Sequence, residues 1–396
     1  MRIKRFISEL CILTHRASSS QNEYRSATHI LELMNSLGLK TKLDEFKSQK
    51  SLVGELVTIL LFFIIASAFS FVKPWLGFLL GVMGAILFWG YFSNQFKPIA
   101  PLFRHSKSYN VIGRFPNESA IYKVIFTAHH DTARSSPLWH PKRVASFRFS
   151  FLTGVALLLL LLIFLLLKAL KINFLFTNIF IILLCVYILG QIIILIYGRI
   201  TGTLIQGAND NASGVAVILD LAAKLKESSF PDFEFWFAST GSEEVGAIGM
   251  VNFMKNYKSK FSKETTYFIN IDNVGSGQLH YYLGEGMLNF YKFSDELIQT
   301  AQKVVAKKEF IAVTPKKYRV AYTDAIIPAS KGYHAILLLA TDERDVIPNW
   351  HWETDNLDNI DFRTVEKTSN FTFEMVRQLN NDLIKKVEEE KRNRKE

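Results

Sequence analysis

Side chains that can bind a metal ion or transfer a proton occur in five short clusters along the chain. The clusters are Ala128-His129-His130-Asp131-Thr132, Gly207-Ala208-Asn209-Asp210-Asn211-Ala212-Ser213-Gly214, Thr240-Gly241-Ser242-Glu243-Glu244-Val245-Gly246, Ile271-Asp272-Asn273 and His351-Trp352-Glu353-Thr354-Asp355. They offer histidine nitrogens and carboxylate oxygens, without a thiolate. This ligand set suits a catalytic zinc ion or a related divalent ion such as cobalt or manganese. The chemistry of such a site is attack of an activated water on a carbonyl.

Each cluster alone would be weak evidence for a site. Adjacent glutamates such as Glu243 and Glu244 usually belong to a solvated helix face. Residues 207–214 alone could form an Asx-type turn that caps a helix. The order of the clusters is stronger evidence, because each follows an apolar run. Open α/β sheets place their sites at the ends of strands, so we expect these clusters to meet in the folded chain.

The elements that would position the clusters alternate between strand-like and helical patterns. Apolar runs of strand length occur at residues 121–128, 233–239, 265–272 and 335–340. Helical spacing occurs between them, for example at residues 213–227, within and after the second cluster. This alternation predicts an α/β fold with a mostly parallel central sheet flanked by helices.

Four further apolar runs are longer than core helices of water-soluble proteins usually are. They are residues 56–72, 74–96, 149–167 and 172–198, and none carries a charged side chain. Each run could cross about 30 Å of hydrocarbon as a helix. Short turns around Lys73 and around residues 168–171 pair the runs into two hairpins. We therefore predict transmembrane hairpins at 52–93 and 149–199, and one water-soluble domain built from residues 1–51, 94–148 and 200–396.

The composition agrees with a membrane protein of this design. Of the 396 residues, 49% are hydrophobic, and the two cysteines are too few for a disulfide framework. The net charge is +10. Lysine and arginine are frequent at the hairpin ends that face the water-soluble domain, and the positive-inside rule then predicts that this domain is cytoplasmic. We interpret the net positive charge as juxtamembrane lysine and arginine residues that lie near anionic lipid. No motif indicates a nucleic-acid partner.

Taken together and in this order, the clusters resemble the di-zinc exopeptidase family of bacterial leucyl aminopeptidases, aminopeptidase Y and glutamate carboxypeptidase. The resemblance covers essentially the whole chain outside the hairpins. It includes the strand entry at residues 109–113 and the pair Thr323-Asp324, with Gly332 beyond it. The resemblance implies that the water-soluble segments form one peptidase domain, with a zinc-exopeptidase-like fold. The two hairpins depart from the family pattern, and we interpret them as a membrane anchor inserted at loops.

The resemblance also implies a set of metal ligands. Asp210 would bridge two Zn²⁺ ions, although other divalent ions are possible. His129 and Asp272 would complete the protein ligands of one ion, and Glu244 and His351 those of the other.

Two further residues receive catalytic roles from the resemblance. Asp131 would hydrogen-bond the free ring nitrogen of His129 and so set its tautomer. Glu243 would not bind metal. It would take a proton from the attacking water and deliver it to the leaving amine.

The sequence therefore predicts a membrane-anchored di-zinc aminopeptidase that acts on peptides. Carboxypeptidase action stays open, because it depends on groups that bind a free carboxylate instead of a free amine. One alternative is a glutaminyl cyclase-like acyltransferase with a single zinc, which Trp350-His351 and Asp355-Asn356 suggest. Residues 207–214 match the peptidase pattern better. The other alternative is a non-catalytic receptor or scaffold of the same fold, a class in which metal ligands are usually missing.

Overall fold

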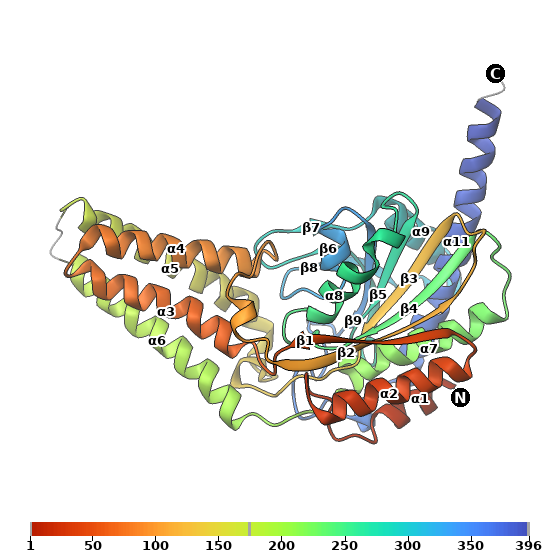
Figure 1. The fold of residues 1–396 in the computed structure, drawn as a ribbon, viewed down its shortest axis with the longest axis horizontal. Helices are drawn as coiled ribbons and strands as arrows, with labels where there is room; N and C mark the ends of the chain where they lie inside the picture. Colours follow the sequence, from red (N-terminus) through yellow and green to blue (C-terminus); the bar gives the residue numbers. More distant parts are fainter. Residues whose placement is uncertain (1, 173–175, 394–396) are drawn as a thin grey trace.

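The computed structural model describes residues 2–172 and 176–393. Figure 1 shows two parts: a mixed α/β domain, and a bundle of long helices that projects from one side of it. The chain enters the bundle twice, between β1 and β2 and again between β3 and α7. The α/β domain is therefore assembled from three separate stretches of sequence.

Within the described residues, nine strands form one sheet in the order β1-β2-β4-β3-β5-β9-β6-β7, and β8 pairs with β6. The strands are β1 (Lys40–Ser48), β2 (Ser106–Phe115), β3 (Tyr122–His129), β4 (Phe233–Thr240), β5 (Thr266–Ile271), β6 (Gln278–Glu285), β7 (Tyr291–Lys292), β8 (Thr314–Tyr318) and β9 (His334–Thr341).

The sheet is mixed, so the prediction of a mostly parallel sheet is wrong. The four apolar runs correspond to β3, β4, β5 and β9, and these neighbours are all parallel. The other strands add the antiparallel pairs β1–β2, β2–β4, β6–β9 and β6–β7. Continuous apolar runs reveal strands buried on both faces, which are typically parallel. The outer strands are more polar, as the partly exposed β1 shows, and they carry no such signal.

Helices cover both faces of the sheet, because alternate strand residues point to opposite sides. Val124 and Phe126 of β3 join a core with α1 (Arg2–Leu10), α2 (Gln21–Ser36), α7 (Ser213–Lys226), α9 (Asp295–Val305) and α11 (Phe362–Asn393). Ile125, between them in sequence, joins the opposite core with α8 (Ile248–Tyr257) and α10 (Ile326–Ala329). The result is a three-layer scaffold, with the central strands between two helical layers.

The bundle consists of α3 (Val53–Ser70), α4 (Pro74–Phe92), α5 (Phe147–Ala169) and α6 (Thr177–Thr201). Among the described residues, these four helices are long and apolar enough to cross a membrane. α3 and α4 lie within residues 52–93, whereas α5 begins and α6 ends slightly outside 149–199. Residues 173–175 of the second hairpin lie outside the described residues.

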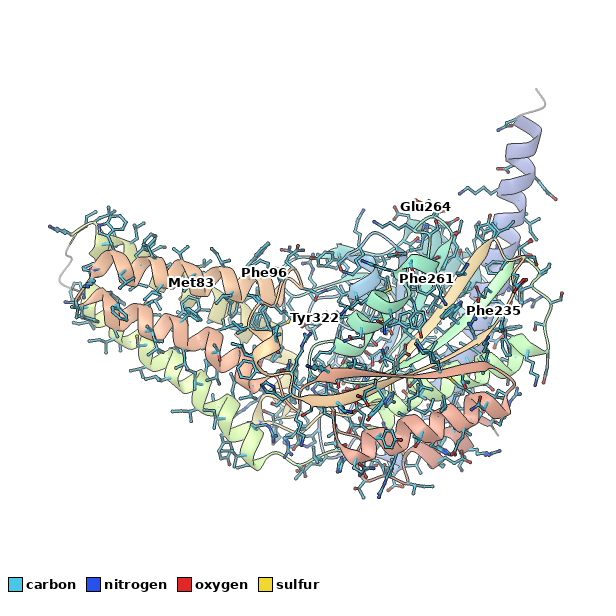
Figure 2. The ribbon with its side chains drawn as sticks, in the orientation of Figure 1. Met83, Phe96, Phe235, Phe261, Glu264 and Tyr322 are labelled. Carbon is cyan, nitrogen blue, oxygen red and sulfur yellow. The ribbon has the colours of Figure 1, made fainter. Side chains whose placement is uncertain are left out.

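The surface of the bundle is apolar as well as its interior. Large apolar side chains face outward from every helix, and Met83 of α4 is one of them (Figure 2). Others are Leu61, Ile65, Leu79, Leu159, Ile163, Ile182 and Ile193. Water-soluble proteins rarely expose continuous apolar surfaces of this extent, and such surfaces mark contact with a membrane or another protein.

Glycines let α3 and α4 approach closely. Gly77, Gly81 and Gly84 are buried along one side of α4. A Cβ atom at Gly77 would lie 2.6 Å from the main-chain oxygen of Ala66 on α3, which is closer than atoms can pack. Small residues have this packing role in many membrane helix pairs.

Polar contacts join the bundle to the α/β domain just after the C-terminal end of α4. The hydroxyl of Tyr291 in β7 donates to the main-chain oxygen of Ser93 at 2.7 Å. The ammonium of Lys97 donates to the hydroxyl of Tyr322 at 3.1 Å and to the main-chain oxygen of Gly246 at 3.2 Å. Figure 2 shows Tyr322 between the bundle and the domain. These contacts hold the bundle beside the carboxyl ends of the central strands.

Candidate metal centre

The candidate ligands meet at the carboxyl ends of the central strands. His129 is the last residue of β3, and Asp272 directly follows its parallel neighbour β5. Glu244 follows β4, which pairs with β3 on the other side. Asp210 lies just before α7, and His351 lies in the loop after β9. Five residues that are far apart in sequence are thus brought to one edge of the sheet.

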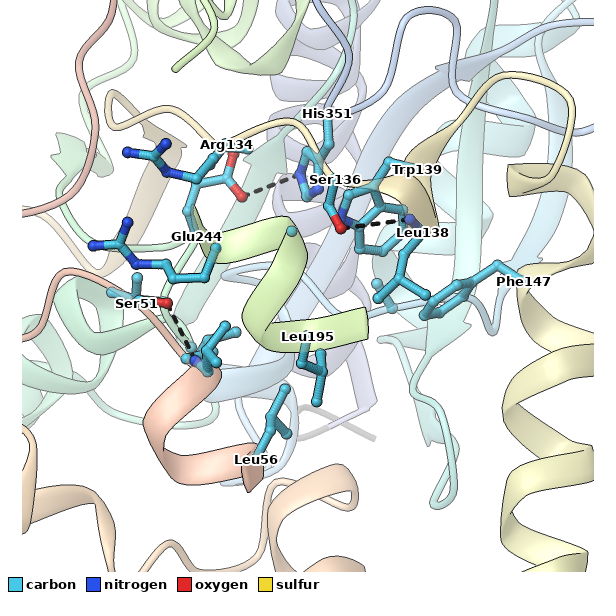
Figure 3. A pocket seen from close by; sticks show the side chains of 18 of the residues that line it. Ser51, Leu56, Arg134, Ser136, Leu138, Trp139, Phe147, Leu195, Glu244 and His351 are labelled. Carbon is cyan, nitrogen blue, oxygen red and sulfur yellow. Dashed lines mark hydrogen bonds and ion pairs between the residues drawn. The ribbon is translucent and has the colours of Figure 1, made fainter. Parts of the chain in front are cut away.

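Asp210 lies between two pairs of side chains. Its Oδ1 is 3.1 Å from His129 Nε2, which is also 3.3 Å from Asp272 Oδ1. Its Oδ2 is 3.1 Å from His351 Nε2, which is also 3.1 Å from Glu244 Oε2. Figure 3 marks the contact between Glu244 and His351. Each carboxylate oxygen of Asp210 therefore faces its own histidine–carboxylate pair.

The centre is largely shielded from solvent. His129 and Asp210 are each 2% exposed, and Asp272 is 3% exposed. One ligand atom each from His129, Asp210 and Glu244 lies within 4.8 Å of the others, a spacing that one metal ion can span. Carboxylates buried this deeply are costly unless a cation or several hydrogen bonds compensate them.

Crowding of the acidic side chains disturbs their ionisation. Burial, partly offset by His351, raises the pKa of Glu244 to about 7, and the charge of Asp210 adds to the effect. Burial and the charge of Asp324 also raise the pKa of Glu243 well above its ordinary value. Glu244 Oε1 is buried and has no hydrogen-bond partner among the described residues. Crowded carboxylates with a free oxygen and histidine nitrogens form a donor set that fits zinc.

The backbone is strained beside three of these side chains. The φ angle is +54° at Ser242, +50° at Asn273 and +49° at His351. A residue with a Cβ atom loses of order 1–3 kcal/mol in this left-handed conformation. Strain of this kind clusters at functional sites, where the surrounding structure enforces it.

Asp131 contacts more of the centre than the sequence predicted. Its carboxylate accepts hydrogen bonds from the main-chain N–H groups of Glu243 at 2.9 Å and Glu244 at 3.2 Å. It also accepts one from the hydroxyl of Ser18 at 2.5 Å. The ring Nδ1 of His129 lies 3.1 Å from the main-chain oxygen of Asp131, but 3.6 Å from its carboxylate. The carboxylate thus positions the two glutamates, and the main chain provides the nearer partner of the histidine.

Asp355 belongs to the centre, although no role was predicted for it there. Its two carboxylate oxygens accept hydrogen bonds from the main-chain N–H groups of Asn209 at 2.6 Å and Asp210 at 3.1 Å. Its own main-chain oxygen accepts from Gly207 at 3.1 Å. Asp355 therefore holds the loop that carries Asp210. Its sequence signals were its place at the end of the His351 cluster and in the pair Asp355-Asn356, which had suggested a cyclase.

Arg16 supports the same loop and could not be found from sequence. Its side chain is fully buried. The guanidinium donates to the main-chain oxygens of His130 at 2.8 Å, Gln206 at 2.7 Å and Gly207 at 2.8 Å. These hydrogen bonds join the His129 cluster to the Asp210 cluster through main-chain oxygens. Every residue has a main-chain oxygen, so no residue pattern in the sequence could predict the bonds.

Comparison with known proteins agrees with this geometry. Residues 195–376 match the sequence profile of Peptidase family M28. Aminopeptidase YwaD of Bacillus subtilis is 39% identical over 71 residues, which make up 18% of this chain and 15% of that protein. The resemblance to zinc exopeptidases is confirmed. The matched segments span between 11% and 36% of the lengths of the curated relatives.

Solved structures share the fold of this chain over nearly its whole length. The zinc aminopeptidase BSAP from Bacillus subtilis aligns with a TM-score of 0.55 and 15% identity, covering 95% of this chain and 93% of that chain. The glutaminyl cyclase of Porphyromonas gingivalis aligns with a TM-score of 0.57 and 12% identity, covering 95% and 96%. The fold alone therefore does not separate peptidase from cyclase activity.

We predict that Asp355→Ala weakens zinc binding about 10–100-fold, the usual effect of removing a group that orients metal ligands. The substitution leaves the N–H groups of Asn209 and Asp210 without their acceptor, so the Asp210 loop loses its anchor. The zinc dissociation constant, measured by competition with a chromophoric chelator, checks this. Asp358→Ala is the control, because Asp358 is exposed nearby and its carboxylate holds no part of the loop. Equal zinc affinity in both variants would contradict the role of Asp355.

Proposed function

We propose that this protein is a membrane-anchored metallo-aminopeptidase that removes the N-terminal residue of peptides. The observation that carries the proposal is the position of Asp210, whose two oxygens face separate histidine–carboxylate pairs. This arrangement favours two metal ions that share one bridging carboxylate. The match to Peptidase family M28 and the aminopeptidases among the relatives support the same activity.

His129 and Asp272 would hold one zinc ion, Glu244 and His351 the other, and Asp210 both. When bound, zinc supplies Lewis acidity, which makes water a nucleophile at neutral pH and polarises a carbonyl. The protein's part is to fix these ligands, and the hydrogen bonds of Asp355 and the main-chain strain at His351 serve that purpose.

Glu243 is the residue we assign to proton transfer. It lines the same cavity as the ligands and is partly exposed to it. Its main-chain N–H is held by the carboxylate of Asp131, which keeps it beside Glu244. A carboxylate in this place can take a proton from water and pass it to the leaving amine.

Replacing Glu243 by Gln removes the proton acceptor and keeps nearly the same shape. We expect hydrolysis of a dipeptide to slow by about 10²–10⁴-fold, the usual contribution of general acid–base catalysis. Steady-state kinetics with a leucine dipeptide measure the rate, and elemental analysis verifies that the zinc content is unchanged. Undiminished turnover by a zinc-loaded Glu243→Gln protein would show that another group moves the proton.

Zinc content tests the bridging role of Asp210 and separates the candidate functions. We expect about two zinc ions per wild-type chain and about two in Glu243→Gln, because that residue does not bind metal. Asp210→Ala should lose both ions and the activity, since each ion loses a ligand and the site loses negative charge. Retention of both ions in Asp210→Ala would refute the bridge. One ion in the wild type would favour a cyclase, and none would favour a scaffold.

We further propose that α3–α6 span a membrane as two hairpins and that the α/β domain is cytoplasmic. The outward apolar side chains of the bundle support the first part. Lysines and arginines near the bundle ends beside the α/β domain support the second, including Lys97, Arg134 and Arg199, because cations are retained on the cytoplasmic side. Peptide substrates would then come from the cytoplasm or from the membrane itself.

Labelling of intact cells with an impermeant thiol reagent tests this orientation. Single cysteines would replace Lys73, Ser119 or Ser259, which are all exposed, in a chain without Cys11 and Cys185. Lys73 lies in the turn between α3 and α4, and the two serines lie in the α/β domain. We expect labelling at position 73 alone, and at all three positions after the cells are lysed. Labelling at 119 and 259 without 73 would place the domain outside the cell.

A further inference from the structure

A cavity of about 610 Å³ connects the metal centre to the interior of the helix bundle. At one end it is lined by the candidate ligands and Glu243. At the other it is lined by residues from all four bundle helices, among them Leu56 of α3, Phe92 of α4, Phe151 of α5 and Leu195 of α6. We call this second part the bundle arm. Figure 3 shows Glu244, His351, Leu56 and Leu195 around the same space.

The bundle arm reaches deep along the helices. On α6 its lining extends from Arg199 back to Tyr187, and on α5 from Phe147 to Leu158. At 1.5 Å per residue, these stretches are about 16–18 Å long. This is roughly half of a 30 Å hydrocarbon layer, or one leaflet of a bilayer. An extended peptide of about five residues has the same length.

Aromatic rings form a continuous wall between the two ends of the cavity. The ring centroid of Trp139 lies 4.8 Å from that of His351, and 4.7 Å from that of Phe147 at the start of α5. Trp350 also packs on Trp139, with centroids 4.5 Å apart. Figure 3 shows Trp139 between His351 and Phe147. A chain bound at the metal centre can therefore follow an apolar surface into the bundle.

The two ends of the cavity differ in chemistry. The metal centre offers carboxylates and imidazoles, whereas the bundle arm offers mainly leucine, isoleucine and phenylalanine side chains. A ligand complementary to both has a polar, hydrolysable end and an apolar remainder. A small water-soluble peptide would leave the bundle arm without a partner.

We propose that the bundle arm binds the apolar residues that follow the scissile bond, so that the preferred substrates are hydrophobic peptides that partition into the membrane. This inference rests on the proposed aminopeptidase function and specifies its substrate class. The bundle arm is continuous with the metal centre and lies among helices that are long and apolar enough to span a bilayer. Both observations favour the apolar tail of the substrate, and not a separate ligand, as the occupant of the arm.

A pair of glycine substitutions tests the bundle arm. Gly154 of α5 lines it, and a Cβ atom there would meet only the hydroxyl of Tyr187, at 3.2 Å. Gly154→Leu should therefore fill part of the arm with little strain. Gly190 of α6 is the matched control, because it does not line the cavity and a Cβ atom there would meet nothing within 4 Å.

The substrates are two peptide amides of equal length, Leu-Ala-Leu-Leu-Leu-Leu and Leu-Ala-Ser-Ser-Ser-Ser. The full-length zinc-loaded protein would be assayed in phosphatidylcholine nanodiscs. We expect wild type to prefer the leucine tail at least tenfold in kcat/KM, since burying one methylene is worth about fourfold in affinity. Gly154→Leu should reduce this preference at least tenfold, and Gly190→Leu should keep it. Partitioning into the bilayer acts on all variants equally, so an unchanged preference in Gly154→Leu would overturn the proposal.

Photocrosslinking gives a readout that does not need turnover. A leucine-tailed peptide with p-benzoylphenylalanine in the tail would be irradiated with Glu243→Gln protein, with and without zinc. We expect crosslinks at Leu56, Phe151 or Leu195, and their loss in Gly154→Leu. Crosslinks confined to outward residues such as Leu159 and Ile193, or to the α/β domain, would overturn the proposal.

These experiments distinguish failure of the bundle-arm proposal from failure of the proposed aminopeptidase function. Glu243-dependent hydrolysis of both peptides, with no effect of Gly154→Leu on their ratio, overturns the bundle arm and leaves the aminopeptidase function intact. If zinc-loaded wild type hydrolyses neither peptide, the aminopeptidase function fails, and the crosslinks then decide whether the arm binds an apolar chain.

Discussion

The organisation of this protein depends on the burial of several carboxylates at one point. Asp210 and Asp272 lie beside His129 almost without access to water, and Glu244 lies nearby. Buried carboxylates repel one another and lose their hydration, so they persist only where a cation or fixed donors compensate them. The surrounding structure supplies rigid supports for such a cation site: parallel strand ends, strained turns, and the hydrogen bonds made by Asp131 and Asp355.

The support comes from the most deeply buried strands of the sheet. β3, β4 and β5 are buried between two hydrophobic cores, and the candidate ligands follow their carboxyl ends. The two helix hairpins enter at loops and leave the central pairing of these strands intact. An insertion at a loop costs little when its ends already lie close together, which explains how the fold tolerates so large an addition.

The hairpins nevertheless change what surrounds the metal centre. Their ends nearest the α/β domain line the bundle arm, and Trp139, in the segment between β3 and α5, packs against His351. Part of the cavity at the candidate metal centre is thus walled by apolar helices. The same four helices would then anchor the protein in the membrane and select its substrates.

Several features of this protein follow from sequence alone. Long uncharged runs predicted the four apolar helices, because length and hydropathy are local properties. Continuous apolar runs predicted β3, β4, β5 and β9, because strands buried on both faces need no polar residues. The order of the clusters containing His129, Asp210, Glu244, Asp272 and His351 indicated the resemblance to zinc exopeptidases, since the order of short motifs can be read along the chain.

Tertiary structure decided the rest. The antiparallel edge strands, the loop-holding roles of Arg16 and Asp355, and the second set of partners of Asp131 arise from contacts between distant segments, many of them with main-chain atoms. Main-chain groups are the same in every residue, so they leave no pattern to read. The bundle arm also required the structure, because its lining comes from four helices and several loops that only folding brings together.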